Sequence, residues 1–170
     1  MQISDIQSFL QYYSKIKART SRLFAYIPPD KMEWAPSPNQ FTFGDLIRHL
    51  ANIERYMYAE TVQGRSSIYS GCGTAFAAGY EATCTYYHAK HQESIAIFEQ
   101  LSENSLSSKC MTPGGTPITV WKWLRAMVEH EVHHRGQLYT YLGILGIKTP
   151  PMFGMTSEEV AAASPNQSNS

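Results

Sequence analysis

The sequence of 170 residues has no excess of charge of either sign, no long apolar run and no closely spaced pair of cysteines. Lys plus Arg and Asp plus Glu both number 14, so no basic surface is expected for nucleic acid or anionic lipid. No apolar run reaches the ~18 residues of a membrane helix, and residues 1–6 lack the basic and apolar segments of an export signal. We therefore expect a cytoplasmic protein that binds neither nucleic acid nor a membrane.

The three cysteines, Cys72, Cys84 and Cys110, are odd in number and never form a C-x-x-C pair. A chain of this length does not need disulfides to support its core, so a reducing compartment fits it best. Cys72 lies between two glycines, but no helix N-terminus or basic partner is evident beside it. We expect a structural or incidental role for this thiol.

Strand patterns are also scarce, whereas four segments repeat apolar residues at helical spacing. These segments span about residues 3–23, 42–64, 83–103 and 119–145. The second opens with Thr42 and Asp45, which form a capping box that uses aspartate. The pattern predicts an all-α four-helix bundle with long loops and at most a short hairpin near residues 112–119. We expect one domain over residues 1–163, and a disordered tail over residues 164–170 because that stretch is small and polar.

The fourth segment carries the chemistry, in the octapeptide His130–Gln137 (HEVHHRGQ). His130 and His134 are four residues apart, which places them about 40° apart around a helix and one turn apart along it. Both lie on the apolar stripe that should face the core. One ion can therefore sit between the two imidazoles, and Zn, Ni, Cu and Fe all accept this ligand.

A third ligand is needed, and His49, on the inward stripe of the second helix, is the best candidate. His91, inward on the third helix, is held in reserve. The alternative for each histidine is a hydrogen-bonded core residue without a metal. His88 and His133 lie off the stripes and are weaker candidates.

The same octapeptide matches H-E-x-x-H, in which two histidines bind zinc and the glutamate is the general base of a peptidase. The extended form of that motif needs Gly and His where this chain has Gln137 and Thr140. By angular count Glu131 lies about 80° from the centre of the histidine pair, and Gln137 about 40°. We therefore expect Gln137, more than Glu131, to assist catalysis beside a metal.

Aromatic residues on the inward stripes should line a half-apolar pocket around that metal. They are Tyr56, Tyr87, Trp123 and Tyr141. For each one, ordinary core packing is the alternative. Tyr56 and Tyr87, together with His91, are our candidates for contact with a cofactor.

Two motifs together resemble the DinB family of metalloenzymes: Phe43–Leu50 (FGDLIRHL) and His130–Gln137. The segments Tyr141–Gly146 and Pro150–Gly154 (PPMFG) resemble the ending of that family, so the resemblance covers most of the chain. It implies an up-down-down-up bundle in which His49, His130 and His134 hold a divalent metal, Zn, Ni or Fe, with open positions for water or substrate. It does not imply DNA binding.

The resemblance also implies a function, because characterised relatives are transferases and isomerases that use bacillithiol, mycothiol or glutathione. Our leading hypothesis is a thiol-dependent S-transferase in which the metal activates a small cofactor thiol toward a small-molecule electrophile. One alternative is a hydrolase that uses metal-bound water, assisted by Glu131 or Gln137. Another is a metal-binding stress-response protein without catalysis. A homodimer is a further hypothesis, because Gly136 and Gly143 permit close approach of helices; ordinary packing within the chain is the alternative.

Overall fold

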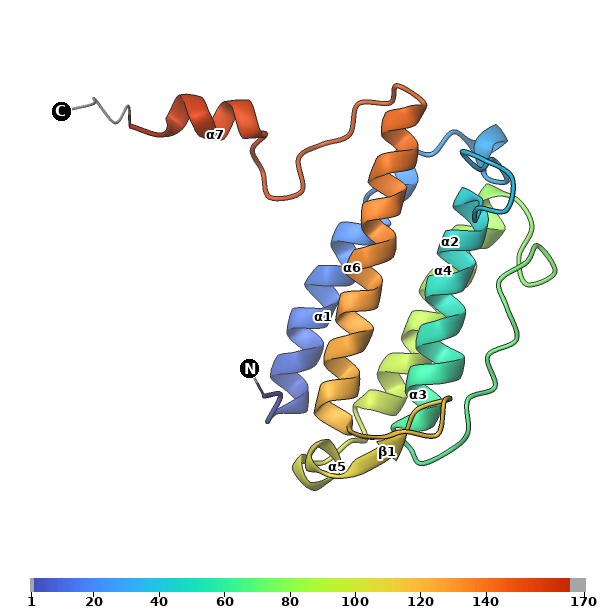
Figure 1. Cartoon of the computed structure of the whole chain (residues 1–170), viewed down its shortest axis with the longest axis vertical. Helices are drawn as coiled ribbons and strands as arrows, with labels where there is room; N and C mark the ends of the chain where they lie inside the picture. Colours follow the sequence, from blue (N-terminus) through green and yellow to red (C-terminus); the bar gives the residue numbers. More distant parts are fainter. Residues whose placement is uncertain (1, 166–170) are drawn as a thin grey trace.

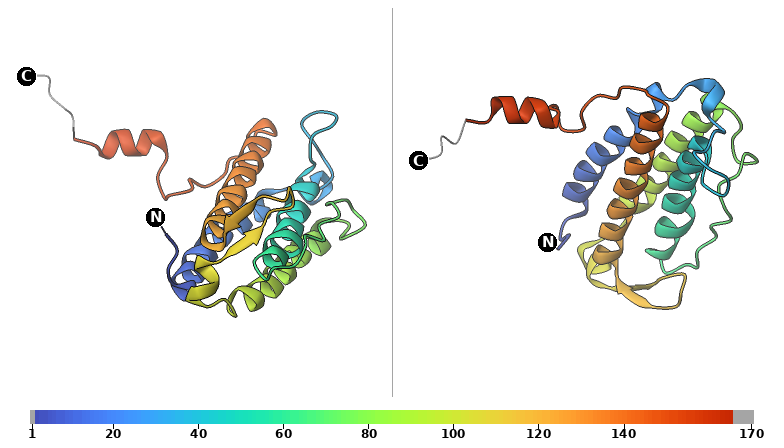
Figure 2. Two further views of the ribbon diagram at one scale, coloured as in Figure 1. Left: turned by 60° about the horizontal axis from the view of Figure 1, so that its bottom comes forward. Right: turned by 45° about the horizontal axis from the view of Figure 1, so that its top comes forward.

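The four helical segments form one bundle in the structure, a computed structural model that describes residues 2–165 (Figure 1). The long helices are α1 (Ile6–Ser21), α2 (Phe43–Ile53), α4 (Tyr80–Phe98) and α6 (Val120–Ile144). The chain runs up α1, down α2, down α4 and up α6 (Figure 1), which is the expected up-down-down-up order. Because α2 and α4 point the same way, the loop over residues 62–79 must return along the whole bundle, and it does so on the outside (Figure 2).

Side-chain capping marks where α2 and a further short helix begin. The predicted box at the start of α2 is confirmed: the Asp45 N–H donates to Oγ1 of Thr42 at 2.9 Å, and the Thr42 N–H donates to Oδ2 of Asp45 at 3.1 Å. The predicted end of the third helix at Glu103 is wrong, because α4 ends at Phe98. Ser102 instead caps a separate short helix, α5 (Glu103–Ser107).

The helix continues beyond α2 with an irregular turn that the sequence pattern did not predict. Residues Glu54–Tyr58 (η3) form a π-helical turn before the short helix α3 (Ala59–Thr61). A π turn adds one residue to the α-helical spacing, so the side chains beyond it rotate relative to the predicted stripe. At the end of this turn Tyr58 is buried, whereas Tyr56 within it is only partly buried.

The hairpin lies between α5 and α6 in the sequence. Strands β1 (Lys109–Met111) and β2 (Pro117–Thr119) pair antiparallel, with Cys110 opposite Ile118. The prediction of a short hairpin is confirmed, although its first strand begins before the expected residues 112–119. Thr119 stands at the N-cap of α6, but its hydroxyl accepts a hydrogen bond from Lys109 at 3.0 Å instead of capping the helix.

Three short elements complete the described chain. Two 3₁₀ turns, η1 (Phe24–Tyr26) and η2 (Pro29–Lys31), connect α1 to α2, and α7 (Ser157–Ala163) follows α6. α7 stands away from the bundle in both figures (Figures 1 and 2). Of the predicted tail over residues 164–170, residues 166–170 lie outside the described part, and the domain boundary at residue 163 stays a prediction.

The buried interior has two apolar clusters separated by a polar layer. On α6, the residues of one cluster fall within Val120–Val128 and those of the other within Leu138–Leu142. Between these two stretches lie Glu131 and His134, which are 2% and 8% exposed. The other helices contribute buried Lys17, His49 and Glu54. We call these five residues and the half-buried His130 the polar layer. Buried polar groups need partners, so this layer is where function is to be sought.

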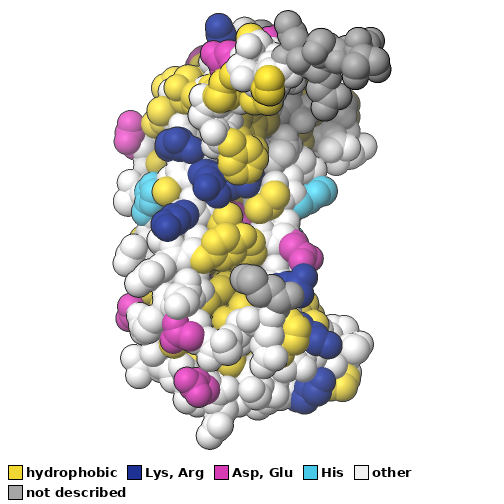
Figure 3. Space-filling view, turned by 90° about the vertical axis from the view of Figure 1, so that its left-hand side faces the viewer, with side chains coloured by type: hydrophobic (Ala, Val, Ile, Leu, Met, Phe, Trp, Pro, Cys, Tyr) yellow, Lys and Arg dark blue, Asp and Glu magenta, His cyan; other side chains and the backbone are white. Residues whose placement is uncertain are grey.

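The outer surface is mixed in character. The side of the molecule on which α1 lies carries patches of hydrophobic side chains interleaved with Lys and Arg (Figure 3). Gly136 and Gly143, on which the homodimer expectation rests, are exposed on α6 with open space around them. The homodimer stays a prediction. Among the described residues, no helix combines the length and the apolar character needed to span a membrane.

Candidate metal centre

Helices α2 and α6 bring His49, His130 and His134 together within the polar layer. The Nε2 atom of His130 lies 3.1 Å from Nε2 of His49 and 3.0 Å from Nε2 of His134. The ligand atoms of all three lie within 4.8 Å of one another, and residues 2–165 contain no other such group of His, Cys, Asp or Glu. The three histidines that helical phase selected therefore form one cluster that can hold a metal ion.

The spacing of the nitrogens fits a single ion. Zinc–imidazole bonds are about 2.0–2.1 Å long, so two nitrogens on one ion lie about 2.8–3.4 Å apart at bond angles of about 90–110°. The two short separations in the cluster, 3.0 and 3.1 Å, fall in this range. Imidazole suits several transition metals, so the ligands fit a divalent metal without selecting one.

Oxygen atoms hold the outer nitrogens of two of these histidines. Nδ1 of His134 lies 2.5 Å from Oε1 of Gln137, and Nδ1 of His49 lies 2.8 Å from the phenol oxygen of Tyr69. An amide oxygen only accepts hydrogen bonds, so Nδ1 of His134 carries the proton and its Nε2 lone pair faces the cluster. The phenol oxygen of Tyr69 can accept from His49 in the same way. These contacts orient the rings for metal binding.

Burial keeps the three imidazoles neutral. Burial and then the charge of His134 lower the pKa of His49 to about 4. Burial, followed by the charges of His134 and His49, lowers the pKa of His130 to about 3. Burial also lowers the pKa of His134. Neutral imidazole is the metal-binding form, so the ligands need not lose a proton at pH 7.

Sequence reasoning missed Tyr69, because it lies in the loop over residues 62–79, where no periodicity exists. The loop is pinned by buried side chains of α2. Arg48 Nε donates to the carbonyl of Cys72 at 2.7 Å, and Nδ2 of Asn52 donates to the carbonyl of Gly71 at 2.7 Å. Both donors are fully buried. The only signal in the sequence is Arg48 itself, a cation adjacent to His49 in a helix that packs inward.

Arg48 is in turn held by carboxylates. Its Nη1 and Nη2 groups lie 2.8 Å from Oε1 of Glu33 and Oδ1 of Asp45, respectively. The hydrogen bonds from Arg48 hold the pKa of Glu33 below its usual value, against the opposing effect of partial burial. The Arg48 guanidinium thus ties the loop before α2, the helix itself and the loop after it into one support for His49.

Aromatic rings wall the histidine cluster, but not those that the inward stripes predicted. The ring of Phe41 lies 5.2 Å from that of His49 and 6.3 Å from that of His134. Tyr69 lies 5.6 Å from His49, and Tyr58 lies 6.3 Å from His130. Phe41 directly precedes the N-cap of α2, a position where apolar residues often pack, so this one residue had a sequence signal.

Tyr56, a predicted cofactor contact, stands elsewhere. Lys90 Nζ lies 5.6 Å from the centre of its ring, and the Arg55 guanidinium lies 5.3 Å from it. The physical reason is the π turn, which rotates Tyr56 off the stripe and brings Tyr58 toward His130.

The remaining aromatic predictions, Trp123 and Tyr141, pack within the core. The ring of Tyr141 is edge-on to Phe43 at 5.5 Å. Trp123 donates from Nε1 to the hydroxyl of Thr61 at 2.9 Å, and its ring lies 4.6 Å from that of Tyr58. Trp123 therefore packs against Tyr58, one of the rings beside the histidines. Tyr141 belongs to the apolar cluster that contains Leu138 and Leu142.

Glu131, Tyr87 and His91 lie in a buried ion network with Lys17 and Glu54. The Tyr87 hydroxyl donates to Oε1 of Glu131 at 2.7 Å, and Lys17 Nζ lies 3.3 Å from Oε2 of the same carboxylate. Lys17 also pairs with Glu54 at 2.8 Å, and Nδ1 of His91 lies 2.7 Å from Glu54. These three predicted site residues contact the network rather than the three histidines.

This network accounts for the H-E-x-x-H match without a peptidase. A general base must reach the water that it activates. Both oxygens of the Glu131 carboxylate are instead occupied by Tyr87 and Lys17, at a side chain that is 2% exposed. The glutamate of the motif here stabilises the interior of the bundle.

Comparisons with known proteins identify the family and the fold. The model of the DinB superfamily matches residues 12–138. The curated protein YjoA of Bacillus subtilis (strain 168), described as uncharacterized, is 23% identical over 137 residues, which cover 79% of this chain and 86% of YjoA. Its crystal structure, described as DinB-like, superposes with a TM-score of 0.63 at 22% identity, covering 81% of this chain and 91% of that one.

Two further structures share the fold. A DinB-like protein from Bacillus cereus ATCC 10987 has a TM-score of 0.72 at 15% identity, covering 87% of this chain and 97% of that one. A mycothiol-dependent maleylpyruvate isomerase has a TM-score of 0.62 at 14% identity, covering 79% of this chain and 60% of the isomerase. At these identities the likeness concerns the fold alone. The family match over residues 12–138, most of its length, shows that this chain belongs to the DinB superfamily.

Proposed function

We propose that this protein is a divalent-metal-dependent S-transferase that joins a small external thiol, such as bacillithiol, mycothiol or glutathione, to a small electrophile. The convergence of the Nε2 atoms of His49, His130 and His134 carries the proposal. These histidines would hold the metal, and Tyr69 and Gln137 would orient two of them.

The number of ligands favours catalysis over a structural metal. Structural zinc sites are closed by four protein ligands, whereas catalytic sites use three and keep a position for water or substrate. Among the described residues the cluster holds three ligands, and His91, the reserve candidate for a ligand, contacts Glu54 instead. His130 is also only partly buried, which leaves a side of the cluster accessible. These observations speak against the non-enzymatic alternative.

The chain's own thiols favour an external one. Burial raises the pKa of Cys72, Cys84 and Cys110, so each is mainly the unreactive thiol at neutral pH. The isomerase that shares the fold is described as mycothiol-dependent, which supports the same choice of nucleophile.

The metal, when bound, would act as a Lewis acid that lowers the pKa of a thiol and so favours its thiolate. Phe41, Tyr58 and Tyr69 would shield the reacting sulfur from water on the side where their rings stand. In the reaction the thiolate sulfur forms a bond to carbon, the leaving group departs with its electron pair, and the thiol proton passes to solvent.

The hydrolase alternative is less well supported. It needs a side chain that can take a proton from water near the histidines. Glu131 is engaged by Lys17 and Tyr87, and Oε1 of Gln137 accepts from His134. Neither is placed as a free base in the structure.

The test is a conjugation assay with monochlorobimane and each of the three thiols, using metal-loaded protein. We expect catalysed loss of chloride with at least one thiol, and we expect His134→Ala to reduce it to the uncatalysed rate. His88→Ala, which removes an exposed histidine from α4, is the matched control and should keep its activity. No conjugation with any of the thiols, or full activity in His134→Ala, would contradict the proposal.

A further inference from the structure

A cavity of about 350 Å³ lies at the hairpin end of the bundle, between the turn that follows α3 and strand β1. Its lining includes two cationic side chains, Arg65 and Lys109, and no Asp or Glu. Hydroxyl groups line it as well, among them those of Ser66 and Thr112. A concave site with positive charge and hydroxyl donors suits an anion.

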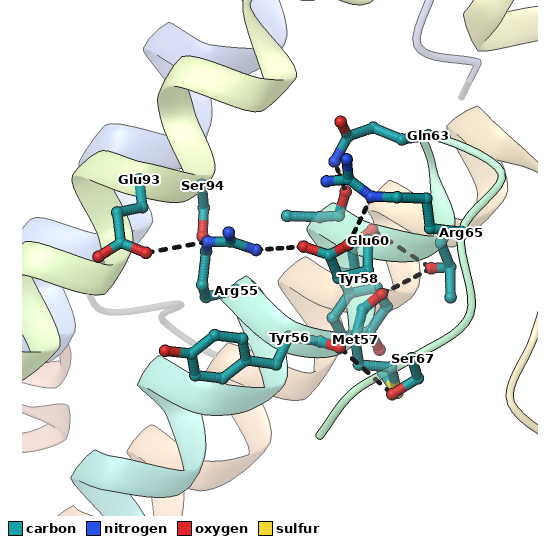
Figure 4. A network of polar contacts seen from close by, with 12 residues as sticks. Arg55, Tyr56, Met57, Tyr58, Glu60, Gln63, Arg65, Ser67, Glu93 and Ser94 are labelled. Carbon is teal, nitrogen blue, oxygen red and sulfur yellow. Dashed lines mark hydrogen bonds and ion pairs between the residues drawn. The ribbon is translucent and has the colours of Figure 1, made fainter. Parts of the chain in front are cut away.

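Arg65 ends a series of alternating charges that links α4 to the turn after α3 (Figure 4). Lys90 pairs with Glu93 at 2.6 Å, and Glu93 pairs with Arg55 at 3.0 Å. Glu60 then accepts from both Arg55 and Arg65, the latter at 2.6 Å. This series of side chains contains three cations and two carboxylates, so its net charge is one positive. Its Arg65 end forms part of the cavity wall.

Several hydrogen-bond donors beside Arg65 have no partner among the described residues. Arg65 uses Nε for Glu60, and its two terminal NH₂ groups have no partner within residues 2–165. The backbone N–H of Ser66 has none within the same residues. Lys109 gives one hydrogen bond, to Thr119 at 3.0 Å, and an ammonium group has three donors. Several donors are therefore free to bind an oxygen ligand.

The cavity is distinct from the histidine cluster. Thr61 lines the cavity, and its hydroxyl accepts from Nε1 of Trp123 at 2.9 Å. The Trp123 ring lies 4.6 Å from that of Tyr58, which in turn lies 6.3 Å from the ring of His130. Two aromatic rings thus stand between the cavity and the candidate metal centre.

We propose that this cavity is a second binding site, which takes a small oxyanion or the carboxylate group of a small organic acid. The Arg65 guanidinium offers parallel donors that match two oxygens of such a group, and Lys109 adds a point charge. No Asp or Glu lines the cavity, and the carboxylate that pairs with Arg65, that of Glu60, is also paired with Arg55. An inorganic oxyanion and an organic carboxylate would be bound by the same donors, and the experiment below distinguishes them.

The experiment is calorimetric titration of the metal-free protein with inorganic phosphate and, separately, with malonate, at constant ionic strength. We expect saturable binding of one anion per chain for at least one of these probes. Tighter binding of phosphate would identify an inorganic oxyanion, and tighter binding of malonate an organic acid. We expect Arg65→Ala and Lys109→Ala each to weaken it about tenfold or more, because each removes a charge-assisted hydrogen bond. Both side chains are exposed, so the variants should fold.

Two control variants test whether the anion binds in this cavity. Lys122→Ala removes an exposed cation of α6 outside the cavity lining and should leave binding unchanged. His49→Ala should also bind the anion normally, whatever the outcome of the metal experiments. Titration without saturation, or equal weakening in Lys122→Ala, would overturn the proposal. Loss of binding in His49→Ala would do so too, because it would place the anion at the histidines.

Discussion

Nδ1 of His49 lies 2.8 Å from the phenol oxygen of Tyr69, although one residue belongs to α2 and the other to a loop twenty positions further along the chain. The contact exists because Arg48 and Asn52, on the same helix as His49, hold the backbone of that loop at Cys72 and Gly71. One helix thus supplies both a candidate metal ligand and the groups that position its outer partner.

Tyr69→Phe is expected to weaken metal binding. The substitution removes the oxygen that holds Nδ1 of His49, and loss of such an outer partner typically reduces metal affinity about 10- to 100-fold. Competition between the protein and a chromophoric chelator for Zn²⁺ measures the change. Tyr12→Phe, at a side chain that is 51% exposed, is the matched control. Equal affinities of Tyr69→Phe and the wild type would show that the phenol does not support the ligand.

Arg48→Lys should loosen the loop over residues 62–79. Lysine keeps the charge but cannot reach Glu33, Asp45 and the loop carbonyls at once, as the guanidinium does. We expect faster amide hydrogen exchange in this loop and weaker Zn²⁺ binding than in the wild type. Arg125→Lys, at an exposed position of α6, should change neither. Unchanged exchange in the loop would mean that Arg48 does not anchor it.

The fold was largely predictable because helical phase and capping depend on local sequence. The box at Thr42 and the stripe that contains His130 and His134 are local features, and both hold in the structure. Tyr58 and Tyr69 could not be predicted. Tyr58 turns inward through a π turn, and Tyr69 depends on long-range hydrogen bonds from Arg48 and Asn52.

The function of Glu131 was unpredictable for a related reason. Its partners Lys17 and Tyr87 come from two other helices, so a motif within α6 carries no trace of them. Angular counting did show that Glu131 points away from the histidine pair. It did not show that this direction leads into the core.

Lys17→Met should destabilise the fold strongly. Lys17 is 4% exposed and lies between Glu54 and Glu131, and removing one partner of a buried ion pair costs about 3–5 kcal/mol. Urea unfolding of both proteins measures the loss. Lys15→Met removes an exposed lysine from the same helix and should change the free energy of unfolding by less than about 0.5 kcal/mol. A loss no larger than this in Lys17→Met would refute a stabilising role for the network.

The metal-free protein should lose stability as the pH falls from about 6.5 toward 4. The pKa of His49 is about 4 and that of His130 about 3 in the folded state, whereas an unfolded histidine has a pKa of about 6.5. In this window the unfolded state binds more protons, so the free energy of unfolding rises with pH. The slope should reach at most about 1.4 kcal/mol per pH unit for each histidine.

Chemical unfolding in the presence of a chelator, at several pH values, measures this slope. His130→Gln removes one of the histidines whose pKa is lowered in the folded state and should make the slope shallower without abolishing it. The expected dependence differs from that of Glu54, whose ion pair with Lys17 and contact with His91 lower its pKa to about 2 despite burial. Its contribution is lost only below about pH 4.5. A stability that does not change between pH 6.5 and 5 would contradict neutral buried histidines.

The central claim is that His49, His130 and His134 hold one divalent metal ion. The most direct measurement is elemental analysis of purified protein after exposure to Zn²⁺ and removal of the free ion. We predict one ion per chain in the wild type and in His88→Ala, and less than about a tenth of that in His130→Ala, because two remaining imidazoles bind weakly. A wild type without metal, or a His130→Ala variant that keeps a full equivalent, would contradict the account.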